Sequence, residues 1–280
     1  MHTFSSATLN HWFRLALRAL RLLGMFSLVG MLGACNSVPR AAVDELTPTG
    51  TLRAAINFGN PILASRDSTT GEARGVSVDL SRELAKRLGV ALELVPFASA
   101  GQTVEGIKAG TVDIAFVAID PVRGADITYS APYVVIEGAY LVRSESPIRS
   151  NAEVDRPGIR IAVGLGSAYD LFLTREIKVA KLVRAPTSPA VVDFFVAQNI
   201  EVAAGVKQQL EMDAKRVPGL RLLDGRFMVI NQAIGTPRGR EAAASYLRSF
   251  VEDMKASGFV ANALSRHGIE GATVAAADTK

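Results

Sequence analysis

From Thr51 onward, short segments typical of β-strands alternate with segments whose apolar residues recur at helical spacing. A strand pattern at 52–56 is followed at 79–88 by a helical pattern, in which leucines and an alanine recur every three or four residues. In the strand expected at 113–118, the residues after Asp113 are apolar without polar alternation, which is typical of a strand buried on both faces. Strands that alternate with helices predict an α/β fold built on mostly parallel sheets flanked by helices.

The same alternation continues to the end of the chain. Further strands are expected at 90–95, 159–163, 182–184, 202–206 and 220–223, and further helices at 104–109, 169–177, 189–198, 208–217, 239–255 and 259–267. Asp79 is expected to be the N-cap of the first helix, and Gly89 is expected to end it. The alanine-rich tail, residues 271–280, is expected to be disordered.

The N-terminal segment has the pattern of a secretory signal. Three arginines precede an apolar run from Leu22 to Leu32, and the first acidic residue is Asp44. We therefore expect residues 1–34 to be a signal peptide. The run is short for a bilayer, so a permanent transmembrane anchor is the alternative.

The sequence Leu32-Gly33-Ala34-Cys35 resembles the lipobox of bacterial lipoproteins. The resemblance implies that the thiol of Cys35 carries a lipid and that residues 35–48 form a tether between the lipid and the folded domain. A plain signal peptide with a cysteine beside its cleavage site is the alternative. Cys35 is the single cysteine of the chain, so no intramolecular disulfide can form.

The mature chain is long enough for two lobes and is nearly neutral. Cleavage before Cys35 leaves 246 of the 280 residues. Removal of the three signal-peptide arginines reduces 31 basic residues to 28, against 27 acidic ones. The basic charge therefore belongs mostly to the signal, and nothing in the composition favours nucleic-acid binding.

Three segments together resemble the bacterial extracellular solute-binding proteins of family 3, which serve polar amino-acid ABC transporters. The first is GVSVDL at 75–80 with ELA at 83–85 and LG at 88–89, the second is GTVD at 110–113 with Arg123 ten residues after the aspartate, and the third is YSAPY at 129–133. Their order and spacing fit the family from about residue 50 to residue 268.

The resemblance implies a two-lobed, periplasmic-binding-protein-like fold of type II, known as the Venus flytrap. Residues 49–136 with 231–270 are expected to form lobe 1, and residues 137–230 are expected to form lobe 2. Two crossover strands, near 134–139 and 228–235, would join the lobes. A ligand would bind between them, and closure would be a hinge motion.

The resemblance also implies that Arg123 holds the carboxylate of the ligand. A guanidinium can pair with both oxygens of a carboxylate at once. A surface arginine on a helix is the alternative. Asp120 stands where the family usually has a threonine; with the proline that follows, it is interpreted as an N-cap rather than as a contact to a ligand amine.

The resemblance implies, too, that the loop 164–170 offers backbone N–H groups of Ser167 and Ala168 to the same carboxylate. A helix N-terminus is chemically suited to this role, since it favours anions. A capping box between Ser167 and Asp170 is the alternative, and both roles are compatible. A dinucleotide-binding loop is disfavoured, since Tyr169 stands where the fingerprint requires its third glycine.

Lys207 lies where amino-acid binders of the family commonly carry an aspartate for the ligand ammonium. A cation there would repel an amine and attract a second acidic group, so the ligand could be a dicarboxylate or another organic anion. A solvated lysine at a helix start is the alternative. Asn57, Phe58 and Asn60 follow the first strand, in the family's first ligand-contacting loop; Phe58 could equally belong to the core.

These features predict the substrate-binding component of an ABC-type uptake transporter, which captures a small carboxylate and delivers it to a permease in the inner membrane. We expect a periplasmic monomer, lipid-anchored through Cys35, without cofactor, metal or nucleic-acid partner. A dehydratase-like enzyme is one alternative, with Asp170 or Glu137 as the acid, but His267 is the only histidine after Cys35. A sensory module for a separate membrane receptor is the other.

Overall fold

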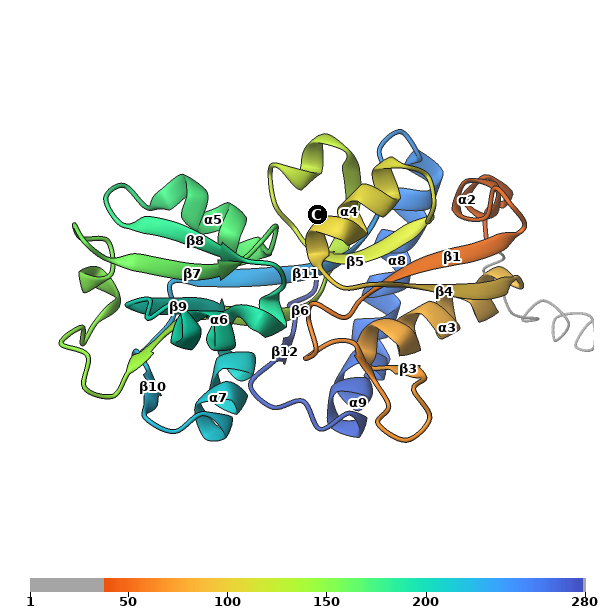
Figure 1. The fold of residues 1–280 in the computed structure, drawn as a ribbon. Helices are drawn as coiled ribbons and strands as arrows, with labels where there is room; N and C mark the ends of the chain where they lie inside the picture. The colour runs from red at the N-terminus through yellow and green to blue at the C-terminus, as the bar shows by residue number, and fades with distance from the viewer. Residues whose placement is uncertain (1–37, 279–280) are drawn as a thin grey trace, which may run out of the picture. The chain divides into compact units, whose positions relative to one another are not determined.

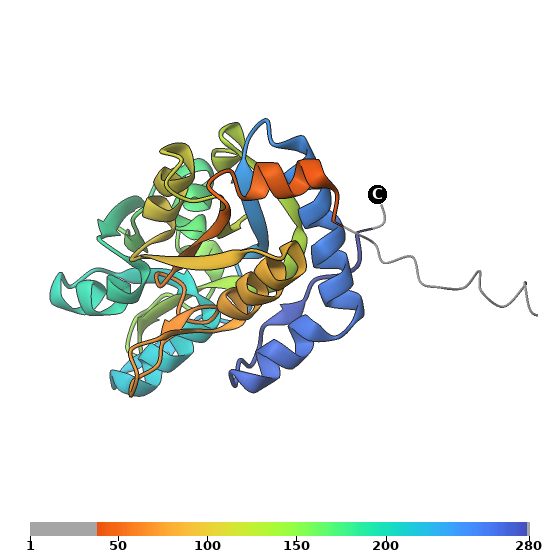
Figure 2. The same ribbon diagram turned by 90° about the vertical axis from the view of Figure 1, so that its right-hand side faces the viewer.

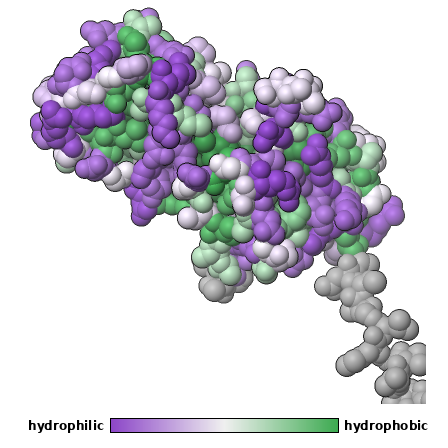
Figure 3. Space-filling model, turned by 90° about the horizontal axis from the view of Figure 1, so that it is seen from below, coloured by the Kyte–Doolittle hydropathy of each residue, from purple (hydrophilic) through white to green (hydrophobic). Residues whose placement is uncertain are grey.

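The computed structural model describes residues 38–278. The expected signal peptide and the expected lipidation site at Cys35 lie outside the described residues. None of the helices from residue 38 to residue 278 is long and apolar enough to cross a membrane. On the face drawn in Figure 3, hydrophobic side chains lie in groups interspersed with hydrophilic ones.

The described residues alternate strands and helices as the sequence predicts. The strands are β1 (Thr51–Asn57), β2 (Ser65–Arg66), β3 (Ala73–Arg74), β4 (Ala91–Phe97), β5 (Ile114–Ala118), β6 (Ile127–Arg143), β7 (Arg160–Gly164), β8 (Lys181–Ala185), β9 (Val202–Val206), β10 (Leu220–Leu222), β11 (Met228–Pro237) and β12 (Thr273–Val274). The α-helices are α2 (Arg40–Leu46), α3 (Val76–Leu88), α4 (Ala100–Lys108), α5 (Ala168–Glu176), α6 (Val191–Ala197), α7 (Lys207–Arg216), α8 (Glu241–Ala256) and α9 (Phe259–Arg266). Short 3₁₀-helices are η1 (Arg123–Ala125), η2 (Asn151–Glu153) and η3 (Ser188–Ala190).

One mixed sheet runs through both lobes in the order β4-β1-β5-β11-β6-β9-β7-β8. Strands β4, β1 and β5 are parallel, as are β9, β7 and β8, whereas the long strands β6 and β11 pair antiparallel in the middle. In Figure 1, α5, α6 and α7 lie with β7–β9 on one side of this central pair, and α3, α4 and α8 lie with β1, β4 and β5 on the other. The fold is therefore the expected two-lobed α/β fold.

Each lobe has its own hydrophobic cores. Two clusters of buried side chains belong mainly to the lobe of β1, β4 and β5, with α3 and α8 packed on them. Two others belong to the lobe of β7, β8 and β9, with α5 and α6. All five residues of β5 are buried, as its continuous apolar pattern predicts.

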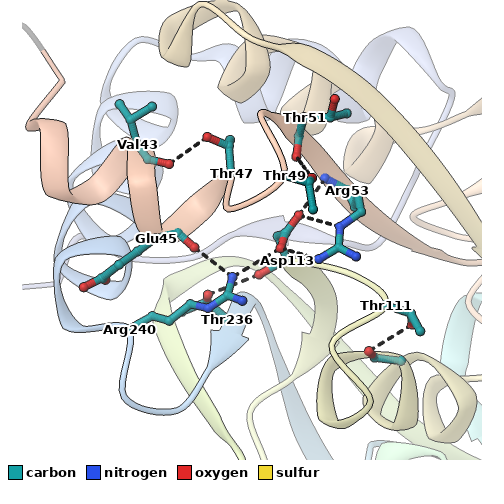
Figure 4. Close-up of polar contacts among 11 residues, drawn as sticks. Val43, Glu45, Thr47, Thr49, Thr51, Arg53, Thr111, Asp113, Thr236 and Arg240 are labelled. Carbon is teal, nitrogen blue, oxygen red and sulfur yellow. Dashed lines mark hydrogen bonds and ion pairs between the residues drawn. The ribbon is translucent and has the colours of Figure 1, made fainter.

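The GTVD motif ends in a buried carboxylate that ties three elements together (Figure 4). Asp113, whose side chain is fully buried, accepts hydrogen bonds from Nη2 and Nε of Arg53 at 2.8 and 3.0 Å. Arg240, just before α8, lies 3.3 Å from the same carboxylate and donates to the carbonyl oxygen of Glu45 at 2.8 Å. The hydrogen bond that Arg53 donates to Asp113 raises the pKa of Arg53. The motif thus joins β1, the start of β5 and the start of α8.

The first helix begins earlier than the sequence indicates. Asp79 was expected to be its N-cap, but α3 begins at Val76 and its N-cap is Gly75. The backbone at Gly75 has φ +125°, and a Cβ there would lie 2.4 Å from the carbonyl oxygen of Leu63. Only glycine fits this turn, so the chain enters the helix before Asp79. Gly89 ends the helix in a left-handed conformation, as predicted.

Part of the expected tether is helical. Residues 40–46 form α2, in which Ala42 and Leu46 are fully buried one turn apart. Figure 2 shows α2 beside α8. The carboxylate of Glu45 accepts the backbone N–H of Ala243 at 2.8 Å and so caps the first turn of α8. The segment folds as a helix although it contains polar residues, because burial of these alanine and leucine side chains stabilises it.

The expectation of a disordered tail is also wrong as far as residue 278. Thr273 and Val274 form β12, which pairs antiparallel with β6 at Val134 and Val135. Ala275 is buried beside this strand. The backbone N–H and C=O groups of β6 need hydrogen-bond partners, and the tail supplies them. The small alanines beside β12 let the tail lie close to β6.

Candidate functional site

A cavity of about 30 Å³ lies between the two lobes. A space of this size holds about two ordered water molecules. It is lined by residues of both lobes and of the central strands: Asn57, Gly59, Asn60, Ala100, Ala118, Arg123, Ser167, Ala168, Tyr169, Ser188, Val206, Ile230 and Gln232. Five of the seven residues expected to bind ligand are among them: Asn57, Asn60, Arg123, Ser167 and Ala168.

The guanidinium of Arg123 is the only charged group among the residues that line this cavity. Arg123 is 4% exposed, and its Nη1 and Nη2 donate to the carbonyl oxygens of Ala118 at 3.1 Å and Gly166 at 2.8 Å. Within residues 38–278, no carboxylate forms an ion pair with it. Burial lowers the pKa of Arg123. The structure therefore holds a desolvated cation between two carbonyl groups, which is a costly arrangement without a negative partner.

The Asp120 carboxylate is committed to protein partners. Its Oδ1 accepts the backbone N–H of Val122 at 2.8 Å, in the turn that leads into η1, and its Oδ2 lies 3.0 Å from Nη2 of Arg175. The prediction that Asp120 is an N-cap is wrong, because η1 begins at Arg123 and its N-cap is Val122, without a side-chain cap. Arg175 belongs to α5, so this pair joins the two lobes beside the cavity.

The N-terminus of α5 faces the cavity from lobe 2. Ser167 is its N-cap and its Oγ accepts the N–H of Asp170 at 3.0 Å, while Asp170 accepts the N–H of Gly166 at 2.9 Å. One half of the expected capping box is therefore present, but the Asp170 carboxylate binds the N–H of Gly166, one residue before the N-cap, instead of that of Ser167. The N–H groups of Ala168 and Tyr169 have no acceptor among the described residues. They remain available to an anion, with the hydroxyl proton of Ser167.

The first loop and the central strand add neutral amides. Oδ1 of Asn57 accepts the N–H of Gly59 at 2.9 Å, so its NH₂ is the end left free. Oδ1 of Asn60 is enclosed and accepts no hydrogen bond within the described chain. Gln232 of β11 is 6% exposed, and its side chain makes no hydrogen bond to the described residues. The cavity thus combines several donors with two uncommitted amide oxygens.

Gln232, Tyr169 and Ser188 were not predicted from the sequence. Gln232 follows Asn231 in the mostly apolar strand β11. The sequence does not show that the side chain of Gln232 is buried beside the cavity. Tyr169 was noted only as the residue that breaks the dinucleotide fingerprint. It is fully buried, and burial raises its pKa.

Two of the predicted residues do not line the cavity. Phe58 packs against the core of lobe 1, and the guanidinium of Arg66 lies 4.5 Å from its ring centroid. Lys207 is the first residue of α7, and its Nζ lies 3.4 Å from Oε2 of Glu137. Glu137 is also paired with Arg226. The charge of Lys207 is therefore directed to a carboxylate on β6.

A second, smaller cavity of about 10 Å³ adjoins the first and shares Asn60, Tyr169 and Val206 with it. It is also lined by Asp213 of α7. The carboxylate of Asp213 accepts hydrogen bonds from Arg216 at 2.9 Å and from Gln209 at 3.0 Å. Its charge is therefore already compensated.

Residues 52–269 match the sequence pattern of a protein family, the bacterial extracellular solute-binding proteins, family 3. An arginine-binding protein mutant from T. maritima has a similar structure, with a TM-score of 0.69 and 20% identity, over 80% of this chain and 98% of that one. A histidine kinase sensor domain described as similar to periplasmic binding proteins gives a TM-score of 0.70 at 17% identity, over 80% and 98% of the two chains. These likenesses show the fold.

A curated relative, the membrane-bound lytic murein transglycosylase F of Aeromonas hydrophila, is 26% identical over 127 residues. The match takes in 45% of this chain and 25% of the relative, so it spans about a quarter of the curated protein.

Proposed function

Because the chain belongs to family 3 of the bacterial extracellular solute-binding proteins, we propose that it captures a small carboxylate between its lobes and delivers it to the permease of an ABC-type uptake transporter. In this proposal residues 49–136 with 231–270 form lobe 1 and residues 137–230 form lobe 2. The ligand-binding residues are Arg123, Ser167, Ala168, Asn57 and Asn60, with Gln232 added.

The observation that carries the proposal is the buried guanidinium of Arg123 without a carboxylate partner. It lies in a cavity to which the other lobe contributes the unpaired N–H groups of Ala168 and Tyr169. A carboxylate there would neutralise the guanidinium and accept the N–H groups of α5. Because the donors come from both lobes, such a ligand would hold the lobes together, as in hinge-closing binding proteins.

The cellular setting is part of the same proposal. The family description is extracellular, which supports a periplasmic location. We propose that Cys35 anchors the protein to a membrane through a lipid and that the protein acts as a monomer beside its permease. Incorporation of labelled fatty acid into the wild type and into Cys35→Ala tests the anchor directly.

The test of ligand binding is a thermal-shift panel of amino acids, hydroxy acids, keto acids and dicarboxylates. A ligand at a hundred times its dissociation constant adds about 2.7 kcal/mol of stability. We expect at least one small acid to raise the melting temperature, and Arg123→Gln to abolish that rise. The exposed Arg149, whose side chain makes no hydrogen bond to the described residues, supplies the control Arg149→Gln. A panel without any shift would contradict the proposal.

An enzyme on this fold is the second candidate, favoured by the partial match to a murein transglycosylase. The residues that line the cavity include no histidine, cysteine, aspartate or glutamate. Glu137 is paired with Arg226 and Lys207, whose contacts lower its pKa and keep it ionised, so it is a poor general acid. These observations support binding over catalysis. Saturable binding with full recovery of the unchanged ligand would distinguish the two.

A sensory module is the third candidate, favoured by the structural likeness to a kinase sensor domain. Such a module would use the same ligand cavity but would act on a separate membrane receptor. Co-purification from membranes after crosslinking would identify either a permease or a receptor as the partner.

A further inference from the structure

The residues that line the inter-lobe cavity carry a positive charge and no negative charge. Arg123 contributes a positive charge, and no aspartate or glutamate is among the lining residues. The remaining polar groups are neutral amides, hydroxyls and backbone N–H groups. A ligand that carries an ammonium group beside its carboxylate would therefore find a partner for its negative charge and none for its positive charge.

The carboxylates nearest to the cavity are each bound by a cation of the protein. Asp120 pairs with Arg175 at 3.0 Å. Asp170, at the N-terminus of α5, pairs with Arg184 at 3.0 Å. Both carboxylates also accept backbone N–H groups. Neither is free to turn toward a ligand without leaving an arginine unpaired.

The carboxylates on the lobe 2 side are likewise bound by cationic or amide side chains of the protein. Glu137 pairs with Arg226 and Lys207. Asp213, which lines the smaller adjoining cavity, is held by Arg216 and Gln209. An α-ammonium, one bond away from the carbon that bears the carboxylate, would stay close to Arg123. It would then face a like charge in a desolvated space.

Neutral hydrogen-bond donors suit the same space. The Oδ1 atom of Asn60 is enclosed without a donor, and the side chain of Gln232, a residue that is 6% exposed and lines the cavity, makes no hydrogen bond to the described residues. Either oxygen can accept a hydrogen bond from a hydroxyl group. A ligand hydroxyl would satisfy a buried acceptor that is costly to leave without a partner.

We infer that the cavity selects a small carboxylate that has no ammonium group and that carries a hydroxyl group beside its carboxylate. This inference rests on the proposed function and names its substrate class. The selectivity comes from the missing negative partner rather than from the shape of the cavity.

The test uses pairs of acids that share a carbon skeleton and differ in one group: lactate with alanine, glycerate with serine, and malate with aspartate. Isothermal titration calorimetry of the purified protein gives the dissociation constant of each. We expect the tightest-bound acid to be a hydroxy acid, with an affinity at least about tenfold above that of its amino acid. Equal or tighter binding of the amino acid overturns the inference and leaves the proposed function standing. Absence of binding by every acid in the panel overturns both.

A charge variant tests the physical reason. Gln232→Glu places a carboxylate in the cavity with nearly unchanged side-chain volume. We expect the affinity for the hydroxy acid to fall by about tenfold or more, because the new carboxylate competes for Arg123, and the ratio of affinities to shift toward the amino acid. Gln198→Glu, at an exposed position of lobe 2, is the matched control and leaves both affinities unchanged. An unchanged ratio in Gln232→Glu overturns the inference.

Discussion

Asp120 of lobe 1 and Arg175 of lobe 2 form an ion pair, with Oδ2 and Nη2 separated by 3.0 Å. The carboxylate is 5% exposed, whereas the arginine side chain is 36% exposed. The pair lies beside Arg123, whose guanidinium donates to the carbonyl oxygen of Gly166 at 2.8 Å and also joins the lobes. Together these two contacts hold the lobes closed around the cavity.

The first prediction concerns this ion pair. Arg175→Gln removes one of the contacts between the lobes and leaves a buried carboxylate without its cation, so the open arrangement gains population. Small-angle X-ray scattering of the ligand-free protein should give a larger radius of gyration for the variant than for the wild type. Arg149→Gln, on the exposed surface of lobe 2, should not change it. Identical scattering of Arg175→Gln and the wild type would show that the pair does not control closure.

The second prediction concerns the close approach of two glycines across the cleft. Gly166 has φ +68°, and a Cβ there would lie 3.2 Å from Cα of Gly101. Gly166→Ala should therefore lose stability through backbone strain, by about 1 kcal/mol, and also weaken ligand binding by obstructing closure. Titration calorimetry beside urea unfolding separates the two effects.

Gly158 offers a matched control for that experiment. Its φ is +82°, but a Cβ there would meet open space. Gly158→Ala should lose a similar amount of stability and keep the wild-type affinity. Equal affinities in the two variants would contradict the proposed role of Gly166 in closure.

The third prediction concerns the buried carboxylate of Asp113. Asp113→Asn leaves the arginines Arg53 and Arg240 without their negative partner, and we expect the free energy of unfolding to fall by about 3–5 kcal/mol. Urea unfolding followed by circular dichroism measures this loss. Asp44, whose pair with Arg40 is exposed, provides the comparison: Asp44→Asn should cost about 0.5 kcal/mol or less. A loss below that of the exposed pair would contradict the structural role of Asp113.

The fourth prediction concerns pH. The hydrogen bond from Arg226, and then the charge and hydrogen bond of Lys207, lower the pKa of Glu137 from its ordinary value of 4.5. Its ionised form therefore stabilises the fold above that value, and this contribution disappears as the pH falls through the lowered pKa. At neutral pH Glu137→Gln should lose about 0.5–1 kcal/mol of stability, since the site is partly exposed.

Urea unfolding at neutral pH and at about pH 2–3 tests the direction of this effect. The difference between Glu137→Gln and the wild type should shrink at the lower pH. Glu145→Gln, at an exposed position that forms no ion pair with the described residues, should behave like the wild type at both pH values. A difference that grows on acidification would show that the pKa of Glu137 is not lowered.

The period of the apolar residues predicted most of the helices and strands, because burial enforces the same period in the folded chain. The continuous apolar run in β5 and the helix end at Gly89 are examples. The sequence did not predict α2 or β12. Both are short segments that are stabilised by distant partners, α8 and β6, and local patterns carry no record of such partners.

In the candidate site, too, the residues with a local sequence pattern were predicted, and those that depend on distant contacts were not. Arg123 and the loop at Ser167 follow from a motif and from helix capping, which are local. The surroundings of Lys207 depend on Glu137, which is 70 residues away in the chain, and spacing alone could not reveal that contact. Gln232 was missed because an amide inside an apolar strand has no motif; only the topology brings it to the cavity.

The most direct test of the account is a titration of the ¹⁵N-labelled protein with the acid that gives the largest thermal shift, followed by NMR. The account predicts saturable shifts of the backbone N–H signals of Ala168 and Tyr169, together with the guanidinium signals of Arg123, because these groups bind the carboxylate. Saturable binding that leaves these three residues unperturbed would contradict it.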